Sequence, residues 1–109
     1  MDLADQKCTP CEIGQPPLTG DQIRPLRMRL SKDWEVVDNH HLQRTFRFDD
    51  FRGALEFANH VGELAEREQH HPDIHLSYGR VTVQTWTHKI GGLSENDFVL
   101  AAKIDRLVR

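Results

Sequence analysis

The fold of this chain is decided by residues 51–86, FRGALEFANHVGELAEREQHHPDIHLSYGRVTVQTW. The first half places its apolar residues at the spacing of one helix face. These are Phe51, Ala54, Leu55, Phe57, Ala58, Val61, Leu64 and Ala65. Asp49 and Asp50 can cap this helix, and it must end before Pro72, because a residue that precedes proline is displaced from the α region. One long amphipathic helix from about residue 51 is therefore predicted.

The second half of the same stretch alternates apolar and polar residues, which is the period of a strand with one buried face. Residues 74–78 and 81–86 both follow this period, and Gly79-Arg80 between them can turn the chain. The pattern predicts an antiparallel hairpin directly after the helix.

The segments upstream predict another helix and another hairpin. Residues 19–22, TGDQ, have the form of a capping box, so a helix begins near residue 20, weakened or kinked by Pro25. Residues 34–37 and 42–48 are typical of strands, and Asp38-Asn39 between them supplies turn residues.

Downstream of the second hairpin, the sequence predicts a last helix. Gly91-Gly92 breaks the chain, and Ser94 with Asp97 three residues later can cap a helix over residues 95–108. Residues 98–102, FVLAA, nearly encircle this helix with apolar side chains. A helix that is apolar on more than one side predicts a contact with a second copy of the chain.

The order helix, hairpin, helix, hairpin, helix predicts an α+β fold. Its form is a four-stranded antiparallel sheet with three helices packed on one face, a two-layer sandwich. Residues 19–109 make up this domain. Residues 1–18, rich in proline and without apolar periodicity, are expected to form an extended N-terminal arm.

The arm contains both cysteines of the chain in one motif, Cys8-Thr9-Pro10-Cys11. Such a pair can be a redox dithiol, half of a zinc site, or a pair that only packs. A zinc site needs two further ligands from elsewhere, and a thioredoxin-like site needs a βαβ context that this order of elements lacks. All three interpretations stay open at this stage.

The composition is that of an ordinary globular domain, with 38% hydrophobic and 28% charged residues among 109. Lys and Arg number 14 against 17 Asp and Glu, a net charge of −3, which disfavours binding to nucleic acid phosphates. The longest apolar run, residues 98–102, is too short for a membrane span or a signal-peptide core. A cytoplasmic location is expected.

Histidine is unusually frequent, with seven residues, four of them between positions 70 and 88. His70 and His71 precede the first strand of the second hairpin, and His88 follows its second strand. These strand ends lie side by side in an antiparallel pair, so we expect the three imidazoles at one edge of the sheet. Imidazoles titrate near neutral pH and can divide into an acid and a base. The remaining histidines outside this cluster are expected at the surface: His40, His41 and His60.

A metal site is the main alternative for the histidine cluster, with His70, His71, Asp73 and His75 as candidate ligands. His71 and His75 have the spacing of a helical zinc pair, but Pro72 lies between them and no HExxH motif is present. Motifs of nucleophilic or phosphate-binding enzymes (GxSxG, the P-loop, GxGxxG) are also absent from the sequence.

The histidine pattern resembles the signature of the pterin-4a-carbinolamine dehydratase family. The matching residues are Glu66-x-x-x-His70-His71-Pro72, Tyr78, His88, Gly92-Leu93-Ser94, Asp97, Trp34 and Phe46-x-Phe48. The resemblance covers residues 18 to 108 and implies the same fold, a homodimer or homotetramer, and no metal or organic cofactor. It implies the loss of water from a 4a-hydroxytetrahydropterin to give the quinonoid dihydropterin, a step in tetrahydrobiopterin recycling.

The resemblance also implies roles for individual residues. His70, His71 and His88 would be catalytic, with His70 as base, His88 as acid and His71 orienting the pterin, although these roles can be permuted. Four flanking residues would contact the substrate: Gln69, Trp86, Thr87 and Lys89. Lys89 stands where an acidic residue is more usual in the family.

Four further residues would support the site, and each also has a purely structural interpretation. Glu66 either orients an imidazole or is solvated, and Asp97 either caps the last helix or takes part in catalysis. Pro72 would fix the backbone that presents the histidines, and Trp34 would belong to the core or to the wall of the site.

Two other functions remain alternatives to this dehydratase. The chain can be a pterin-binding or protein-interaction module, similar to the dimerisation cofactors in this family, with residues 98–102 as its surface. It can also be a dehydratase that acts on another pterin.

Overall fold

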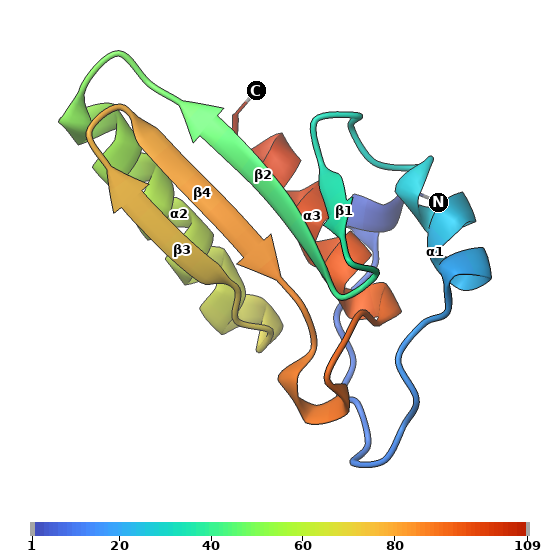
Figure 1. Cartoon of the computed structure of the whole chain (residues 1–109). Coiled ribbons are helices and arrows are strands. Elements are labelled where there is room, and N and C mark those ends of the chain that lie inside the picture. Colours follow the sequence, from blue (N-terminus) through green and yellow to red (C-terminus); the bar gives the residue numbers. More distant parts are fainter. Residues whose placement is uncertain (1, 109) are drawn as a thin grey trace.

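The structure is a computed structural model that describes residues 2–108. The chain alternates helices and strands in the order that the sequence predicts, with two short 3-10 helices added (Figure 1). The elements are η1 (Leu3–Asp5), α1 (Gly20–Arg27), β1 (Glu35–Val37), β2 (His41–Arg47), α2 (Phe51–Glu68), β3 (Asp73–Ser77), β4 (Arg80–Thr85), η2 (His88–Ile90) and α3 (Glu95–Arg106). The helix α1 runs through Pro25 and ends two residues beyond it.

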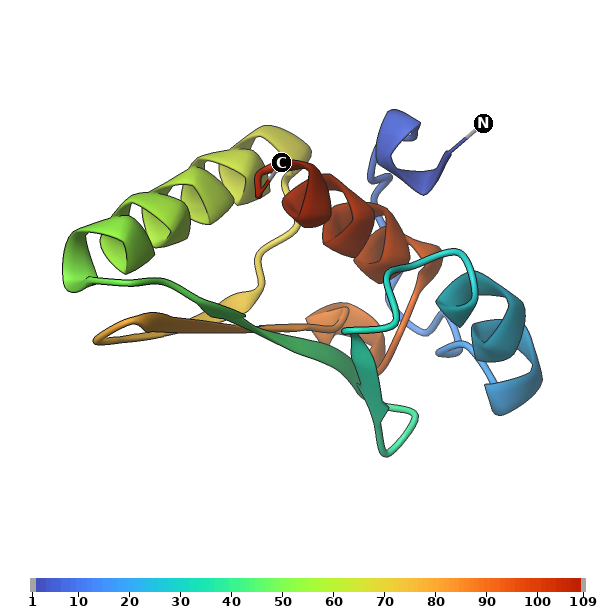
Figure 2. The same ribbon diagram turned by 90° about the horizontal axis from the view of Figure 1, so that it is seen from above.

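The four strands form one antiparallel sheet in the order β1-β2-β4-β3. Helices α2 and α3 lie side by side over one face of this sheet, and α1 packs beside α3 (Figure 2). The predicted two-layer α+β fold is therefore confirmed. Among residues 2–108, no helix combines the length and the apolar character needed to cross a membrane.

The two faces of the sheet differ in polarity, as strand alternation requires. On the covered face, Leu42 and Phe46 of β2 are buried against the helices. On the open face, the hydroxyls of Thr45 and Thr82 are 2.9 Å apart, and the amide of Gln84 donates to Gln43. This alternation fixes the register, because a shift by one residue would turn the polar set toward the core.

The N-terminal arm covers the side of α3 that faces away from the sheet. Helix η1 packs on α3, with Leu3 buried in the same core, and the ammonium of Lys103 donates to the carbonyl of Ala4 at 2.9 Å. Residues 98–101 are no more than 2% exposed in the single chain. The prediction that residues 98–102 form an oligomer contact is therefore wrong for 98–101, because the sheet, α1, α2 and the arm of the same chain together bury them.

Candidate active site

A cavity of about 500 Å³ lies where the ends of several elements meet. It is lined by residues 8–11 of the arm, 68–71 after α2, 86–89 after β4, and Asn96 of α3. The cavity thus brings together His70, His71 and His88, as antiparallel pairing of β3 and β4 predicts. The four expected substrate contacts, Gln69, Trp86, Thr87 and Lys89, line the same cavity.

The C-terminal turn of helix α2 places His70 in the cavity. Gln69 adopts the left-handed conformation, with φ 54° and ψ 38°, and the backbone N–H groups of Gln69 and His70 both donate to the carbonyl of Ala65. This turn reverses the chain, so the His70 side chain is only 11% exposed. Its Nε2 lies 2.6 Å from a carboxylate oxygen of Asp97.

Asp97 is the polar centre of the site and is fully buried in the first turn of α3. Besides His70, it accepts hydrogen bonds from the hydroxyls of Thr85 and Thr87 and from the backbone N–H of Ser94. The four contacts use both oxygens of the Asp97 side chain. Asp97 therefore caps α3 and also holds His70, and a part in catalysis stays a prediction.

His71 has a carboxylate partner of its own at the rim of the cavity. Its Nε2 lies 2.5 Å from an Oε atom of Glu66, one turn back in α2. Both side chains are exposed, 55% and 73%, so the pair orients the ring more than it stabilises the fold. Glu66 is thus placed to orient an imidazole, and the ring it contacts is that of His71.

His88 is presented by the tight loop that follows β4. The backbone N–H of Thr87 donates to the carbonyl of Gly92 at 2.8 Å, which closes η2 into a compact loop. Gly92 also lets the arm approach this loop closely, because a Cβ there would lie 2.7 Å from the Cβ of Pro17. The loop positions the exposed His88 ring against Trp86, with ring centroids 4.5 Å apart.

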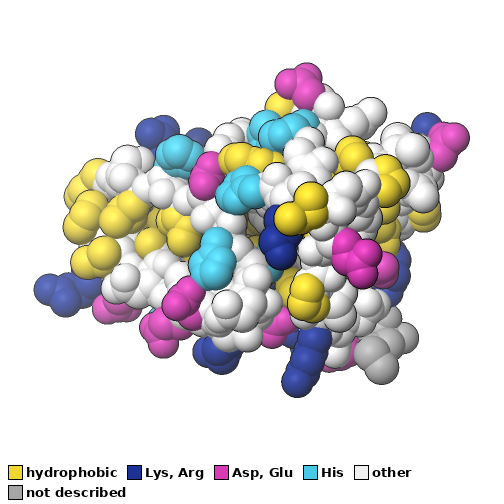
Figure 3. All heavy atoms as spheres, turned by 90° about the horizontal axis from the view of Figure 1, so that it is seen from below, with side chains coloured by type: hydrophobic (Ala, Val, Ile, Leu, Met, Phe, Trp, Pro, Cys, Tyr) yellow, Lys and Arg dark blue, Asp and Glu magenta, His cyan; other side chains and the backbone are white. Residues whose placement is uncertain are grey.

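Trp86 also contacts two histidines that the sequence assigned to the surface. The rings of His40, directly before β2, and His41, its first residue, lie 5.3 Å and 5.8 Å from the Trp86 ring. Burial, and then the neighbouring His40, lower the pKa of His41. Figure 3 shows histidine side chains gathered around hydrophobic ones on one face of the molecule. No local signal identifies this stack, because it joins two hairpins.

None of the four expected supporting residues lines the cavity itself, and only Glu66 and Asp97 form hydrogen bonds with its histidines. Trp34 is fully buried in the core, and its indole N–H donates to Asp105 at 2.9 Å. Pro72 lies between His71 and the first residue of β3, so it can act only on the backbone. Thr87 lines the cavity, and its hydroxyl is hydrogen-bonded to Asp97 and Ser94.

The alternative metal site receives no support from the geometry of the described residues. Within residues 2–108, no three side chains of His, Cys, Asp or Glu converge to hold an ion. The His75 ring instead contacts Gln84 on the open face of the sheet, at 3.3 Å. Of the four candidate ligands, His70 and His71 thus line the cavity, whereas Asp73 and His75 lie on strand β3.

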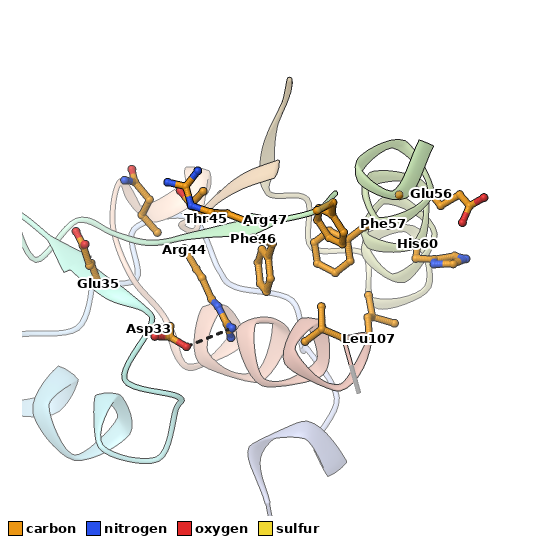
Figure 4. A pocket seen from close by; sticks show the side chains of 14 residues that line it. Asp33, Glu35, Arg44, Thr45, Phe46, Arg47, Glu56, Phe57, His60 and Leu107 are labelled. Carbon is orange, nitrogen blue, oxygen red and sulfur yellow. Dashed lines mark ion pairs between the residues drawn. The ribbon is translucent and has the colours of Figure 1, made fainter. Parts of the chain in front are cut away.

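A larger cavity of about 1000 Å³ lies at the other end of α3, lined mainly by residues of β2 and α2 (Figure 4). Its central cation, Arg44, is paired with Asp105 at 2.6 Å and with Asp33 at 3.4 Å, and it stacks on Phe46. Its only histidine is His60. The Arg44 charge is thus used by the fold, and the histidine cavity is the better candidate for chemistry.

Comparison with known proteins agrees with this choice. The family model described as pterin 4 alpha carbinolamine dehydratase matches residues 16–107. Proteins assigned as pterin-4-alpha-carbinolamine dehydratases from Rubrobacter xylanophilus and Alkaliphilus metalliredigens are 56% and 51% identical. These alignments cover 97% and 95% of this chain, and 98% and 94% of the relatives.

A solved structure supports the fold over most of its length. The crystal structure of a transcriptional coactivator/pterin dehydratase from Brucella melitensis has a TM-score of 0.78 and 31% sequence identity. The match covers 85% of this chain and 99% of that one. From the family match, the relatives and the shared fold, this chain belongs to the pterin-4a-carbinolamine dehydratase family.

Proposed function

We propose that this chain is a hydro-lyase that removes water from 4a-hydroxytetrahydropterin and forms the quinonoid dihydropterin. The observation that carries the proposal is one cavity lined by His70, His71 and His88, in which a buried carboxylate, Asp97, holds His70. The reaction needs one group to protonate the departing 4a-hydroxyl and another to remove the proton from ring nitrogen N5. Imidazoles in a shared cavity supply both groups without a cofactor.

His70 is proposed as the base. When Nε2–H donates its hydrogen bond to Asp97, the neutral ring carries its free lone pair on Nδ1, which can take the N5 proton. The imidazolium formed in this step is stabilised by the Asp97 carboxylate. The Asp–His pair therefore favours both the tautomer and the charge that a base requires.

His88 is proposed as the acid, and His71 as the residue that orients the pterin. The His88 ring is exposed at the rim, where it can exchange protons with water between turnovers. His71 is held by Glu66, and Trp86 offers a flat surface for the pterin ring. Gln69 and Lys89 complete the proposed substrate contacts.

The direct test follows the decay of freshly generated 4a-hydroxytetrahydropterin by stopped-flow ultraviolet absorbance. Wild-type protein is expected to accelerate the decay, and a His75→Ala variant is expected to match it, because His75 lies on the open face of the sheet. A decay that is independent of wild-type protein would overturn the proposal and favour a pterin-binding or interaction role.

Metal chelation provides a separate prediction. Incubation with EDTA followed by gel filtration is expected to leave the rate unchanged, because the proposed acid and base are imidazoles that need no Lewis acid. Loss of turnover that zinc restores would contradict this mechanism.

The proposal includes the recycling of tetrahydrobiopterin in the cytoplasm and assembly into a homodimer or homotetramer. Phe51 and Leu55 stay 45% and 40% exposed, one turn apart on α2, and offer apolar surface for self-association. Sedimentation equilibrium is expected to give two or four chains per particle.

A coactivator-like role through residues 98–102 is not favoured, because residues 98–101 are buried in the single chain.

A further inference from the structure

The CxxC segment of the arm is fastened to α3 by one buried amide. The Asn96 side chain, 7% exposed, accepts from the backbone N–H of Thr9 at 2.9 Å and donates to the Thr9 carbonyl at 2.5 Å. The same amide donates to the Cys11 sulfur, and the Cys8 thiol donates to the Asn96 carbonyl, both at 3.6 Å. Asn96 thus clamps the segment of residues 8–11 through hydrogen bonds to Cys8, Thr9 and Cys11.

This clamp holds the arm against the residues that present the catalytic histidines. The backbone N–H of Cys8 donates to Glu68 at 3.1 Å, directly before Gln69 and His70 in the chain. Asn96 is followed by Asp97, the partner of His70. Residues 8–11 line the same cavity as His70, His71 and His88, so this part of the arm is a wall of the site.

The chemistry of the wall suits contact with a flat, neutral ring rather than a reactive thiol. Burial, and then the neighbouring Glu68 and Asp97 carboxylates, raise the pKa of Cys8 to about 12. A thiol with such a pKa stays protonated and is a poor nucleophile and metal ligand. Neutral sulfur and proline pack well against aromatic rings, as expected in a ligand cavity.

We propose that residues 8–11, held in place by Asn96, form a substrate-binding wall of the pterin site, with Asn96 as its positioning residue. The inference rests on the proposed function and extends it to a segment outside the histidine signature. The wall contacts the substrate ring before and during the reaction alike, so it contributes to binding more than to the chemical step.

Asn96→Asp is the decisive variant. The substitution conserves size, but it removes the donors to the Thr9 carbonyl and the Cys11 sulfur and sets a carboxylate oxygen against that carbonyl. We expect KM to rise about tenfold with kcat nearly unchanged, the signature of lost binding that is uniform through the reaction. Steady-state kinetics measure KM and kcat, and thermal unfolding of the same sample shows that the variant is folded.

Arg106→Gln is the matched control. Arg106 joins α3 to Asp5 and Asp2 of the same arm, but it does not line the cavity. KM is expected to stay at the wild-type value in this control. Equal KM values in Asn96→Asp and wild type would overturn the inference, and so would a common rise in both variants, which would indicate general loosening of the arm.

Thiol labelling gives a readout that does not depend on turnover. Cys11 is half-buried and lines the cavity. Mass spectrometry follows its alkylation by iodoacetamide, and a Cys11→Ser variant identifies the labelled residue. At about ten times its Kd, 7,8-dihydrobiopterin is expected to slow labelling about tenfold, because only the unoccupied fraction reacts. An unchanged rate of Cys11 labelling with the pterin bound would overturn the proposal that residues 8–11 contact the substrate. Wild-type protein that neither turns over nor binds pterin would instead overturn the proposed function.

Discussion

Replacement of His70 by alanine is expected to lower kcat by about 10²–10⁴-fold, the usual contribution of a positioned acid or base. His70 is the imidazole whose tautomer is set, because Asp97 accepts its Nε2–H at 2.6 Å inside the fold. Loss of the ring removes the proposed acceptor for the N5 proton and leaves no neighbouring group at the same place. Stopped-flow absorbance of the decaying 4a-hydroxytetrahydropterin measures the change.

The loss of rate should be separable from any loss of folding. Asp97 keeps the Thr85, Thr87 and Ser94 donors in this variant, so the free energy of unfolding is expected to fall by only about 1–3 kcal/mol. Urea titration at the assay temperature shows whether the variant is folded. A folded His70→Ala protein with wild-type kcat would remove His70 from the mechanism.

Asp97→Ala is expected to have the largest effect on stability, a loss of about 3–5 kcal/mol in the free energy of unfolding. The substitution leaves the hydroxyls of Thr85 and Thr87 and the N–H of Ser94 without their acceptor in a fully buried place. It also removes the cap of α3 and the partner of His70. Equilibrium unfolding in urea checks the magnitude.

Asp97→Asn separates the role of this carboxylate in the fold from its role at the site. The amide retains the shape and one acceptor oxygen but no charge, so kcat is expected to fall about 10–100-fold, as for other carboxylates that orient an imidazole. Asp105→Asn is the matched control. Asp105 binds Trp34 and Arg44 away from the histidine cavity, so its loss should lower stability but leave kcat unchanged. Equal kcat values in both variants would contradict the proposed role of Asp97.

The convergence of His70, His71 and His88 could be predicted from the sequence because it follows from local rules. The helix face of residues 51–65 and the alternation in 74–86 set where α2 ends and how β3 and β4 pair. Antiparallel pairing then brings the beginning of one strand to the end of the other. The roles given to these histidines remain proposals.

The surroundings of the histidines could not be predicted in the same way. The arm meets α3 through contacts between residues far apart in the chain, such as Thr9 with Asn96, 87 positions apart, and Ala4 with Lys103, 99 positions apart. The stack of His40 and His41 on Trp86 joins two separate hairpins. The apolar residues 98–101 suggested a second copy of the chain, whereas the sheet, the other helices and the arm of the same chain bury them.

The sequence by itself determined the elements, the two-layer fold and the three histidines at one edge, because periodicity, capping and strand pairing depend on neighbouring residues. Only the tertiary structure decided that Asp97 holds His70 and that the arm lines the cavity. Such contacts depend on how separate elements pack, and no local pattern specifies which buried donor will meet which acceptor.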